Sequence, residues 1–248
     1  MADERVLAGE TAIVTGAGRG IGRAVARAFA AEGATVYVAA RTAGQVEETR
    51  REIQAAGGRA VAVPMDVTRA RDVEALVGRA VSETGRLDIV VNNAGVFVWK
   101  PFASLEEAEW DRVLGTNLKA SYLLVHAALP YLSASGRGRI LNVASIHGTI
   151  GDANVVAHCA AKFGLIGLTK ALAAELRETG ITVNAISPGS TDNKSRQPER
   201  PVHETPLKEK LHAEDVADAA LFLVSPAAAT ISGAVLDVWG GTHVAIRG

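Results

Sequence analysis

Short apolar runs alternate with amphipathic stretches along most of this chain. Residues 11–15 are apolar and β-branched, as expected of a buried strand, and residues 35–39 form a second run of the same kind. Between the two runs, Ile21, Val25 and Phe29 recur at the spacing of a helix. The pattern therefore predicts a β-α-β unit near the start of the chain.

The alternation continues to the end of the sequence without an internal repeat, a linker or a second domain. Further strands are predicted at 60–63, 87–91, 138–144, 182–187 and 234–238. Helices are predicted at 46–56, 70–84, 106–132, 154–179 and 213–224, with a capping box from Ser104 to Glu107 before the third of these. We therefore expect residues 1–248 to form a single α/β domain, a Rossmann-type doubly wound parallel seven-stranded sheet with helices on both faces.

The stretch at about 190–210 interrupts this pattern. It is polar, contains prolines and has neither helical nor strand periodicity. Such a composition is typical of a mobile loop, so we expect a substrate lid or a partly disordered segment here.

Three glycines, Gly16, Gly20 and Gly22, lie between the first strand and the first helix. Glycine permits a sharp turn and a close approach of the backbone to a ligand. At a helix N-terminus, unpaired N–H groups and the helix dipole favour a phosphate group. An ordinary tight turn is the alternative interpretation of the glycines alone, but the flanking strands favour a dinucleotide site.

The composition is that of an ordinary soluble globular protein. The 248 residues are 48% hydrophobic and carry a formal net charge of −1, so no basic surplus indicates nucleic acid. Cys159 is the single cysteine, which excludes an internal disulfide and fits a reducing compartment. No secretory signal is evident, and no apolar run reaches about 18 residues. We expect a cytoplasmic protein without nucleic-acid or membrane partners.

Several motifs occur in the order known from one enzyme family. Thr15 precedes the spacing G-x-x-x-G-x-G, Asn92-Asn-Ala-Gly95 follows the fourth strand, and Pro188-Gly189 follows the sixth. With Ser145 after the fifth strand and Lys162 in the next helix, nearly the whole chain resembles the short-chain dehydrogenase/reductase family. The resemblance implies an oxidoreductase with a nicotinamide dinucleotide. It places the cofactor at Gly16, Arg19, Gly20, Ile21, Gly22, Arg41, Asp66, Val67, Asn93, Ala94, Gly95, Lys162, Pro188 and Gly189.

Two arginines bear on the choice of cofactor. Arg41 follows the second strand, where an acidic residue would bind the adenosine ribose hydroxyls. An arginine there favours a 2′-phosphate, and Arg19 inside the glycine turn is a second candidate. The pair is similar to the family's NADP-preferring pattern, so NADP(H) is expected to be preferred over NAD(H). The alternative is that both arginines are merely solvated.

The resemblance implies a catalytic set of Asn, Ser, Tyr and Lys. Asn117, Ser145 and Lys162 are in register with that set, but the tyrosine position holds His158. Imidazole has an unperturbed pKa of about 6.5, against about 10 for a phenol. A neutral imidazole can donate an N–H to a carbonyl oxygen, and it can also act as a general base near neutral pH.

Three functions are therefore compatible with the sequence. In the first, the protein is an NADP-dependent carbonyl reductase or alcohol dehydrogenase with His158 as the acid/base. In the second, it binds NADP(H) but catalyses a redox-neutral dehydration, isomerisation or cyclisation through His158 and Ser145. In the third, it is a catalytically silent binding protein. The retained Asn117, Ser145 and Lys162 favour an enzyme, and we expect the oxidoreductase acting on a small molecule.

Other polar residues near these positions carry no clear motif. His147 follows Ser145 by two residues and is interpreted as a polar residue at the lip of the pocket. Together with Asp152 and Cys159 it lacks the ligand spacing of a metal site, so no metal is expected. Trp239 occupies a position that is usually acidic in the family.

Oligomeric state enters only through the resemblance. The family commonly pairs the helices that match 106–132 and 154–179 into dimers and tetramers. A homodimer or homotetramer is therefore expected, and the second helix is rich in small residues that permit close packing: Ala157, Ala160, Ala161, Ala171, Ala173 and Ala174.

Overall fold

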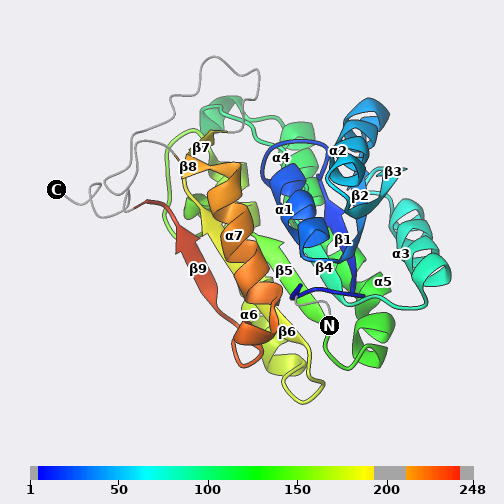
Figure 1. Ribbon diagram of the computed structural model, residues 1–248. Helices are drawn as coiled ribbons and strands as arrows, with labels where there is room; N and C mark the ends of the chain where they lie inside the picture. The colour runs from blue at the N-terminus through cyan, green and yellow to red at the C-terminus, as the bar shows by residue number, and fades with distance from the viewer. Residues whose placement is uncertain (1–4, 193–210, 241–248) are drawn as a thin grey trace.

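The computed structural model describes residues 5–192 and 211–240 (Figure 1). Its centre is a seven-stranded sheet in the order β3-β2-β1-β4-β5-β6-β9, and every neighbouring pair is parallel. The strands are β1 (Thr11–Thr15), β2 (Thr35–Ala40), β3 (Arg59–Pro64), β4 (Ile89–Asn92), β5 (Arg139–Val143), β6 (Thr182–Pro188) and β9 (Val235–Val238). The predicted α/β fold with a parallel seven-stranded sheet is confirmed.

Helices cover both faces of this sheet (Figure 1). They are α1 (Gly20–Ala31), α2 (Ala43–Ala55), α3 (Ala70–Thr84), α4 (Glu107–Leu114), α5 (Ala120–Ala134), α6 (Val156–Glu175) and α7 (Ala213–Val224). Residues of α1, α2 and α7 share one hydrophobic cluster, whereas α3, α5 and the end of α6 share the other. The two clusters are the two halves of the core, one on each side of the sheet.

β1 contributes to both halves, which explains why it reads as a continuous apolar run. Ala12 and Val14 belong to the cluster under α1 and α7, and Ile13 belongs to the cluster under α3 and α5. Successive side chains of a strand point to opposite faces, so a strand covered on both sides is mostly apolar and does not alternate between apolar and polar residues.

The strand order also locates the ligand crevice. β1 pairs with β2 on one side and with β4 on the other, so the chain changes direction across the sheet at this point. In doubly wound folds, the gap beyond the carboxyl ends of the strands at such a switch point holds the ligand. The glycine turn follows β1 and the Asn92-Asn-Ala-Gly95 motif follows β4, so both lie at this gap.

The predicted capping box at Ser104 is wrong. Ser104 ends a short 3₁₀ turn, Phe102–Ser104, and α4 begins at Glu107 with Glu106 as its N-cap. Glu106 and Glu109 form the capping box instead, and Lys100 Nζ bonds to Glu109 at 2.8 Å. In this acidic stretch a glutamate takes the capping position that the sequence pattern assigned to the serine.

The predicted helix at 106–132 is not regular throughout. A π-turn, Gly115–Lys119, separates α4 from α5 and contains Asn117. A π-turn carries one extra residue compared with an α-helical turn, and such turns are frequent at functional sites. Asn117 therefore lies in a local distortion of the helix.

The helix α6 is shorter than the predicted 154–179. Asn154 before it has a positive φ of 65°, which is outside the helical region. Three of the six alanines proposed for subunit packing, Ala157, Ala161 and Ala173, are buried inside this chain and cannot form an interface; the other three are exposed. α6 is long and apolar enough to cross a membrane, but half of the relevant window is buried in the fold, as in core helices of soluble proteins.

Most of the predicted lid, residues 193–210, lies outside the described residues. At its two borders, Thr191–Asp192 (β7) pairs in parallel with Leu211–His212 (β8). The position expected for the lid is thus bounded by a short two-stranded sheet next to the strand end that carries Pro188 and Gly189.

Candidate active site

A cleft of about 590 Å³ lies at the carboxyl ends of the central strands. Every residue that the sequence assigned to the cofactor or to catalysis lines it, from the glycine turn through Asp66 and Asn93 to Lys162 and Gly189. The structure therefore brings all the predicted positions together. Further lining residues carried no sequence signal: Gly18, Ala40, Thr42, Gln45, Met65, Val96, Phe97, Arg112, Thr116, Val143, Ala144 and Thr191.

The glycine turn packs directly against Asn93. A Cβ on Gly22 would lie 2.4 Å from Asn93 Nδ2 and 2.5 Å from the Gly16 carbonyl oxygen. Gly16 and Gly20 have positive φ values of 64° and 54°, which glycine adopts without strain. A side chain at Gly16 or Gly22 would therefore displace either the turn or the strand end beside it.

The first turn of α1 has no side-chain cap among the described residues. The N-cap Arg19 makes no capping hydrogen bond, and no acidic residue lies in the first turn. The N–H groups at this helix end thus face the cleft with the positive end of the helix dipole. This is the chemistry that a phosphate group requires.

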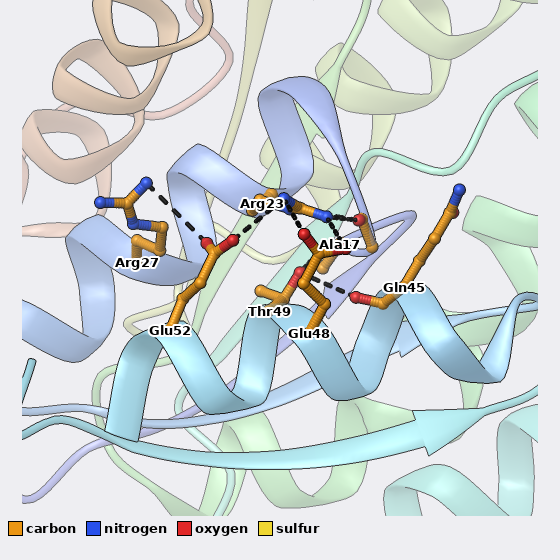
Figure 2. A network of polar contacts seen from close by, with 8 residues as sticks. Ala17, Arg23, Arg27, Gln45, Glu48, Thr49 and Glu52 are labelled. Carbon is orange, nitrogen blue, oxygen red and sulfur yellow. Dashed lines mark hydrogen bonds and ion pairs between the residues drawn. The ribbon is translucent and has the colours of Figure 1, made fainter. Parts of the chain in front are cut away.

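Side chains from α1 and α2 hold the outer side of the turn (Figure 2). Arg23 donates to the Gly18 carbonyl from Nη2 at 2.7 Å and forms ion pairs of 3.1 Å with Glu48 and Glu52. Thr49 Oγ1 donates to the Ala17 carbonyl at 3.1 Å. Two carbonyl oxygens of the turn are thereby bound on the α2 side, away from the helix end that faces the cleft.

Asn93 and Thr15 join the glycine turn to the end of β4. Asn93 Nδ2 donates to the Thr15 carbonyl at 2.9 Å, while Thr15 Oγ1 donates to the Val91 carbonyl at 3.1 Å. Next to them, Asn92 donates to Asn142 on β5 at 2.8 Å inside the core. The asparagines of this motif therefore fix the strand ends that form the floor of the cleft.

Charged groups mark the end of the cleft near α2. Arg19 and Arg41 are both exposed and line it. Burial opposes ionisation of Asp66, but hydrogen bonds from Thr68 and the charge of Arg41 outweigh it and lower the pKa of this carboxyl. Asp66 is therefore an ionised acceptor beside a cation at neutral pH.

The opposite end of the cleft holds the expected catalytic side chains. Ser145 follows β5, and its Oγ accepts the backbone N–H of His147 at 3.2 Å. Lys162 on α6 is buried, and its Nζ donates to the Val143 carbonyl at 2.6 Å. Burial lowers the pKa of Lys162 to about 8, since desolvation disfavours the ammonium form.

His158 is half-buried among polar and aromatic neighbours. Its Nδ1 lies 3.3 Å from Asn117 Nδ2, the Phe97 ring meets it edge to face at 4.9 Å between centroids, and the His147 ring lies at 5.7 Å. The interpretation of His147 as a residue of the pocket lip is wrong, because His147 is buried and is not among the residues that line the cleft, and its Nε2 lies 3.3 Å from Asp152 Oδ2. No group of three metal-ligating side chains occurs within residues 5–192 and 211–240.

Comparison with known proteins decides the family. A family model described as short chain dehydrogenase matches residues 10–203. The chain belongs to the short-chain dehydrogenase family. The 3-oxoacyl-[acyl-carrier-protein] reductase FabG of Staphylococcus aureus is 37% identical over 242 residues, which cover 95% of this chain and 98% of that protein. The cis-4-hydroxycyclohexanecarboxylate dehydrogenase of Sinomonas cyclohexanicum is 39% identical over 245 residues, with 93% and 95% coverage.

Solved structures of dehydrogenases agree with this assignment. A 7α-hydroxysteroid dehydrogenase in complex with NADH and 7-oxo glycochenodeoxycholic acid superposes with a TM-score of 0.91 at 34% identity and covers 97% of both chains. A dehydrogenase/reductase from Sinorhizobium meliloti gives a TM-score of 0.90 at 34% identity, with 96% and 97% coverage. This protein is thus an enzyme of the short-chain dehydrogenase/reductase type.

Trp239 is a buried residue that packs against the end of β6 in this short-chain dehydrogenase. Its Nε1 donates to Ser187 Oγ at 3.1 Å, and a Cβ on Gly189 would lie 3.2 Å from the Trp239 Cα. The tryptophan therefore packs behind the Pro188-Gly189 element where β6 ends. The sequence alone did not indicate this position.

Proposed function

We propose that this enzyme is an NADP-dependent oxidoreductase that transfers a hydride between NADP(H) and a carbonyl or alcohol substrate. The observation that carries the proposal is the shape of one continuous cleft. It runs from the uncapped N-terminus of α1 to the group formed by Ser145, His158 and Lys162. A dinucleotide bound along it would have its pyrophosphate at the helix end and its nicotinamide near the catalytic side chains.

The residues of the cleft fit such a cofactor. The glycine turn leaves room for the backbone to approach the pyrophosphate, and its N–H groups supply hydrogen bonds. When bound, the nicotinamide supplies or accepts the hydride. Pro188, Gly189 and the small Ala94 and Gly95 line the path toward the catalytic end, and Lys162 is placed to hold the nicotinamide ribose.

The preference for NADP(H) over NAD(H) is proposed from Arg41 and Arg19. Both guanidinium groups line the cleft next to the end of β2, where the adenosine ribose of such cofactors lies. A guanidinium binds a phosphate with two charge-assisted hydrogen bonds. Asp66, whose Oδ1 already accepts two hydrogen bonds from Thr68, is assigned to the adenine amino group.

In the proposed reaction, Ser145 and His158 act on the substrate oxygen. Ser145 Oγ–H donates a hydrogen bond to the carbonyl, and His158 takes the position of the tyrosine that usually serves as acid/base. Lys162 lies one helical turn from His158 and contributes its charge and its hydrogen bonds at the ribose. Asn117 holds the imidazole at Nδ1.

A redox-neutral reaction is the second candidate. Its support is the hydrogen-bond contact between Asn117 and His158, because a neutral imidazole that donates one N–H polarises a carbonyl without an oxidation step. In this case NADP(H) would bind without turnover, and His158 with Ser145 would catalyse a dehydration, isomerisation or cyclisation. A silent binding protein would bind the cofactor and convert no substrate.

The substrate is proposed to be a small carbonyl or hydroxyl compound. The relatives named above act on 3-oxoacyl groups and on a hydroxycyclohexane carboxylate, and one structural neighbour was solved with a 7-oxo bile acid conjugate. We therefore place 3-oxoacyl thioesters and cyclic ketones first among test compounds. Reductase activity of the FabG kind is the specific hypothesis that this choice tests.

A homodimer or homotetramer in the cytoplasm is also proposed. Exposed Tyr122 on α5 and Phe163 on α6, together with the exposed Ala160, Ala171 and Ala174, support association through these helices. Light scattering at micromolar concentration should give a multiple of the 25.8 kDa chain mass. A monomeric mass would contradict the proposal.

The decisive experiment follows NADPH absorbance with 3-oxoacyl thioesters, cyclic ketones, aldehydes and quinones, for the wild type, His158→Ala and His158→Tyr. NADPH binding is measured in parallel by fluorescence. Wild-type turnover that falls by about 100-fold or more in His158→Ala is expected, since general acid–base groups contribute about 10²–10⁴-fold. Binding without turnover in the wild type, with turnover gained in His158→Tyr, would contradict the oxidoreductase and favour a redox-neutral reaction or simple binding.

A further inference from the structure

The orientation of the Asn117 amide is determined by a backbone segment rather than by His158. The Val96 N–H donates to Asn117 Oδ1 at 2.8 Å, and Asn117 Nδ2 donates to the Val96 carbonyl at 2.9 Å. A backbone N–H can only donate and a carbonyl can only accept, so exchanging the amide oxygen and nitrogen would break both bonds. The atom that faces His158 is therefore Nδ2, a donor.

This amide nitrogen has one N–H left for the histidine. Nδ2 carries two hydrogens and no acceptor capacity, and one hydrogen is used by the Val96 carbonyl. The second faces His158 Nδ1 at 3.3 Å. A proton on Nδ1 would point at this N–H, so the contact is a hydrogen bond only if Nδ1 accepts and carries no proton.

We propose that Asn117 is a positioning residue that holds neutral His158 in the tautomer with its proton on Nε2. The histidine then offers the cleft a hydrogen-bond donor, whereas Nδ1 is kept as an acceptor for the amide. The inference rests on the proposed function in one respect only: the group that accepts the hydrogen bond from His158 Nε2–H is taken to be the oxygen of a carbonyl substrate. It assigns the Asn117 side chain a role in determining where the proton of the catalytic imidazole resides.

The proton balance limits what this tautomer does. Donating a hydrogen bond from Nε2 moves no proton and leaves the ring neutral. Complete transfer from the neutral ring would leave an imidazolate, so the proton that a reduced substrate gains must come from solvent water or from an imidazolium whose Nδ1 has released the Asn117 N–H. His158 in its neutral form is thus a polarising donor, like the neutral electrophilic histidine of some isomerases.

Several charged or titratable groups surround His158 and share its environment. Lys162 lies one turn away on α6, and His147 with its partner Asp152 lies on the 3₁₀ turn and loop after β5. Arg112 on α4 lines the same cleft. Asn117 contacts Nδ1 itself, so Asn117 is the group whose exchange should move the proton.

The test is nitrogen-15 NMR of the histidine rings in the full chain at neutral pH, without cofactor. The sequence has six histidines, and the His158 signals are assigned as those absent from His158→Gln. Nε2 couples to both ring C–H protons, and a protonated nitrogen resonates far upfield of an unprotonated one. The wild type is expected to show His158 with Nε2 protonated and Nδ1 unprotonated; protonation at Nδ1 alone would overturn the inference.

Asn117→Asp is the sharpest variant, with Asn184→Asp as its matched control. The carboxylate has the size of the amide but accepts a hydrogen bond instead of donating one. His158 in this variant should therefore carry its proton on Nδ1 instead of Nε2, or carry a proton on each ring nitrogen. Asn184 makes the same two backbone hydrogen bonds, from Nδ2 to Ile231 at 2.8 Å and from Ala234 N–H to Oδ1 at 3.0 Å, but lies on β6. Asn184→Asp should leave the His158 pattern unchanged.

The outcomes separate this inference from the proposed function. An unchanged His158 pattern in folded Asn117→Asp overturns the inference, and the wild-type spectrum decides it if the variant fails to fold. If the wild type has the Nε2–H tautomer but converts no carbonyl compound, the inference holds and the proposed oxidoreductase function is wrong. If the enzyme converts a carbonyl compound but His158 is protonated at Nδ1 alone, the proposed function holds and the inference is wrong.

Discussion

The two ends of the cleft are built on different principles. At the cofactor end, the structure relies on backbone groups: the N–H groups of the α1 N-terminus, with the carbonyls of the glycine turn held by Arg23 and Thr49. At the opposite end, the proposed reaction depends on individual side chains such as Ser145 and His158. Backbone sites require a chain path, which glycine spacing specifies, whereas catalysis requires one functional group at one position. The expected glycine spacing is present at the first end, whereas at the second His158 stands where the resemblance implies a tyrosine.

Among the substitutions at the cofactor end, Gly22→Ala should cause the largest loss of NADPH binding. The new Cβ would lie 2.4 Å from Asn93 Nδ2 and 2.5 Å from the Gly16 carbonyl oxygen. Overpacking of this kind costs roughly 1–3 kcal/mol, so NADPH affinity should fall by about 5- to 150-fold or the chain should fail to fold. Fluorescence titration with NADPH measures the affinity, and circular dichroism measures folding.

Gly78→Ala is the matched control for this substitution. Gly78 is exposed on α3, and a Cβ there meets nothing within 4 Å. The variant should bind NADPH as the wild type does and gain about 0.5–1 kcal/mol of stability, as alanine does in helices. If Gly22→Ala bound NADPH as tightly as the wild type, the proposal that the glycine turn binds the pyrophosphate would be wrong.

The catalytic end should make stability depend on pH through Lys162. Burial lowers its pKa from the ordinary 10.5 to about 8, so between these values the unfolded chain binds a proton that the folded chain does not. The free energy of unfolding should therefore rise with pH in this window, by up to about 1.4 kcal/mol per pH unit, and the stabilisation should disappear as the pH falls through 8.

Urea unfolding of the cofactor-free protein between pH 7 and 10.5 measures this slope. Lys162→Met keeps the length of the side chain and removes the titrating group, so the difference between wild type and variant isolates Lys162 from other groups. The slope should be absent in the variant. Equal slopes in both proteins would mean that Lys162 is charged in the folded state throughout this range.

Arg41→Glu should weaken the binding of NADPH without weakening the binding of NADH. Loss of a charge-assisted hydrogen bond costs about 1.5–3 kcal/mol, so the Kd for NADPH should rise by about 10–100-fold. The Kd for NADH should stay the same or fall, because a carboxylate can accept from the ribose hydroxyls. Arg71→Glu on the exposed surface of α3 changes net charge equally and should leave both constants unchanged. A parallel loss of both nucleotides would contradict the role of Arg41 in selecting the phosphate.

Thr49→Val should give the smallest effect, because Thr49 acts behind the turn. Its Oγ1 bonds to the Ala17 carbonyl at 3.1 Å and it is fully buried. Loss of one neutral hydrogen bond costs about 0.5–1.5 kcal/mol, so both NADPH and NADH should bind a few-fold more weakly and to the same extent. Isothermal titration with each nucleotide measures this, and a selective loss of NADPH would show that Thr49 acts on the 2′-phosphate end instead.

The predictable part of the structure is the part with a periodic or backbone cause. The buried strands are mostly apolar because both faces of the sheet are covered, and Gly16 and Gly22 are constrained by their contact with Asn93. Those requirements leave fixed spacings in the sequence. Fold and cleft could therefore be predicted, and all the predicted site residues line one cleft.

The parts that were missed depend on contacts between distant segments. No spacing indicates that Trp239 would donate to Ser187, or that His147 would lie buried beside His158. The N-cap at Glu106 was missed because several acidic side chains compete for this position. A side-chain amide that selects a tautomer leaves no periodic signal, so the link between Asn117 and His158 required coordinates.

The π-turn at Gly115–Lys119 has a consequence for insertions and deletions. A π-turn is an α-helix with one residue added, so deletion of one residue would restore regular hydrogen bonding between α4 and α5. The same deletion would rotate one half of the helix by about 100° relative to the other, and it would turn Asn117 away from Val96 or detach α5 from its core. A single codon therefore separates this chain, in which the Asn117 amide reaches His158, from a chain with a more regular helix.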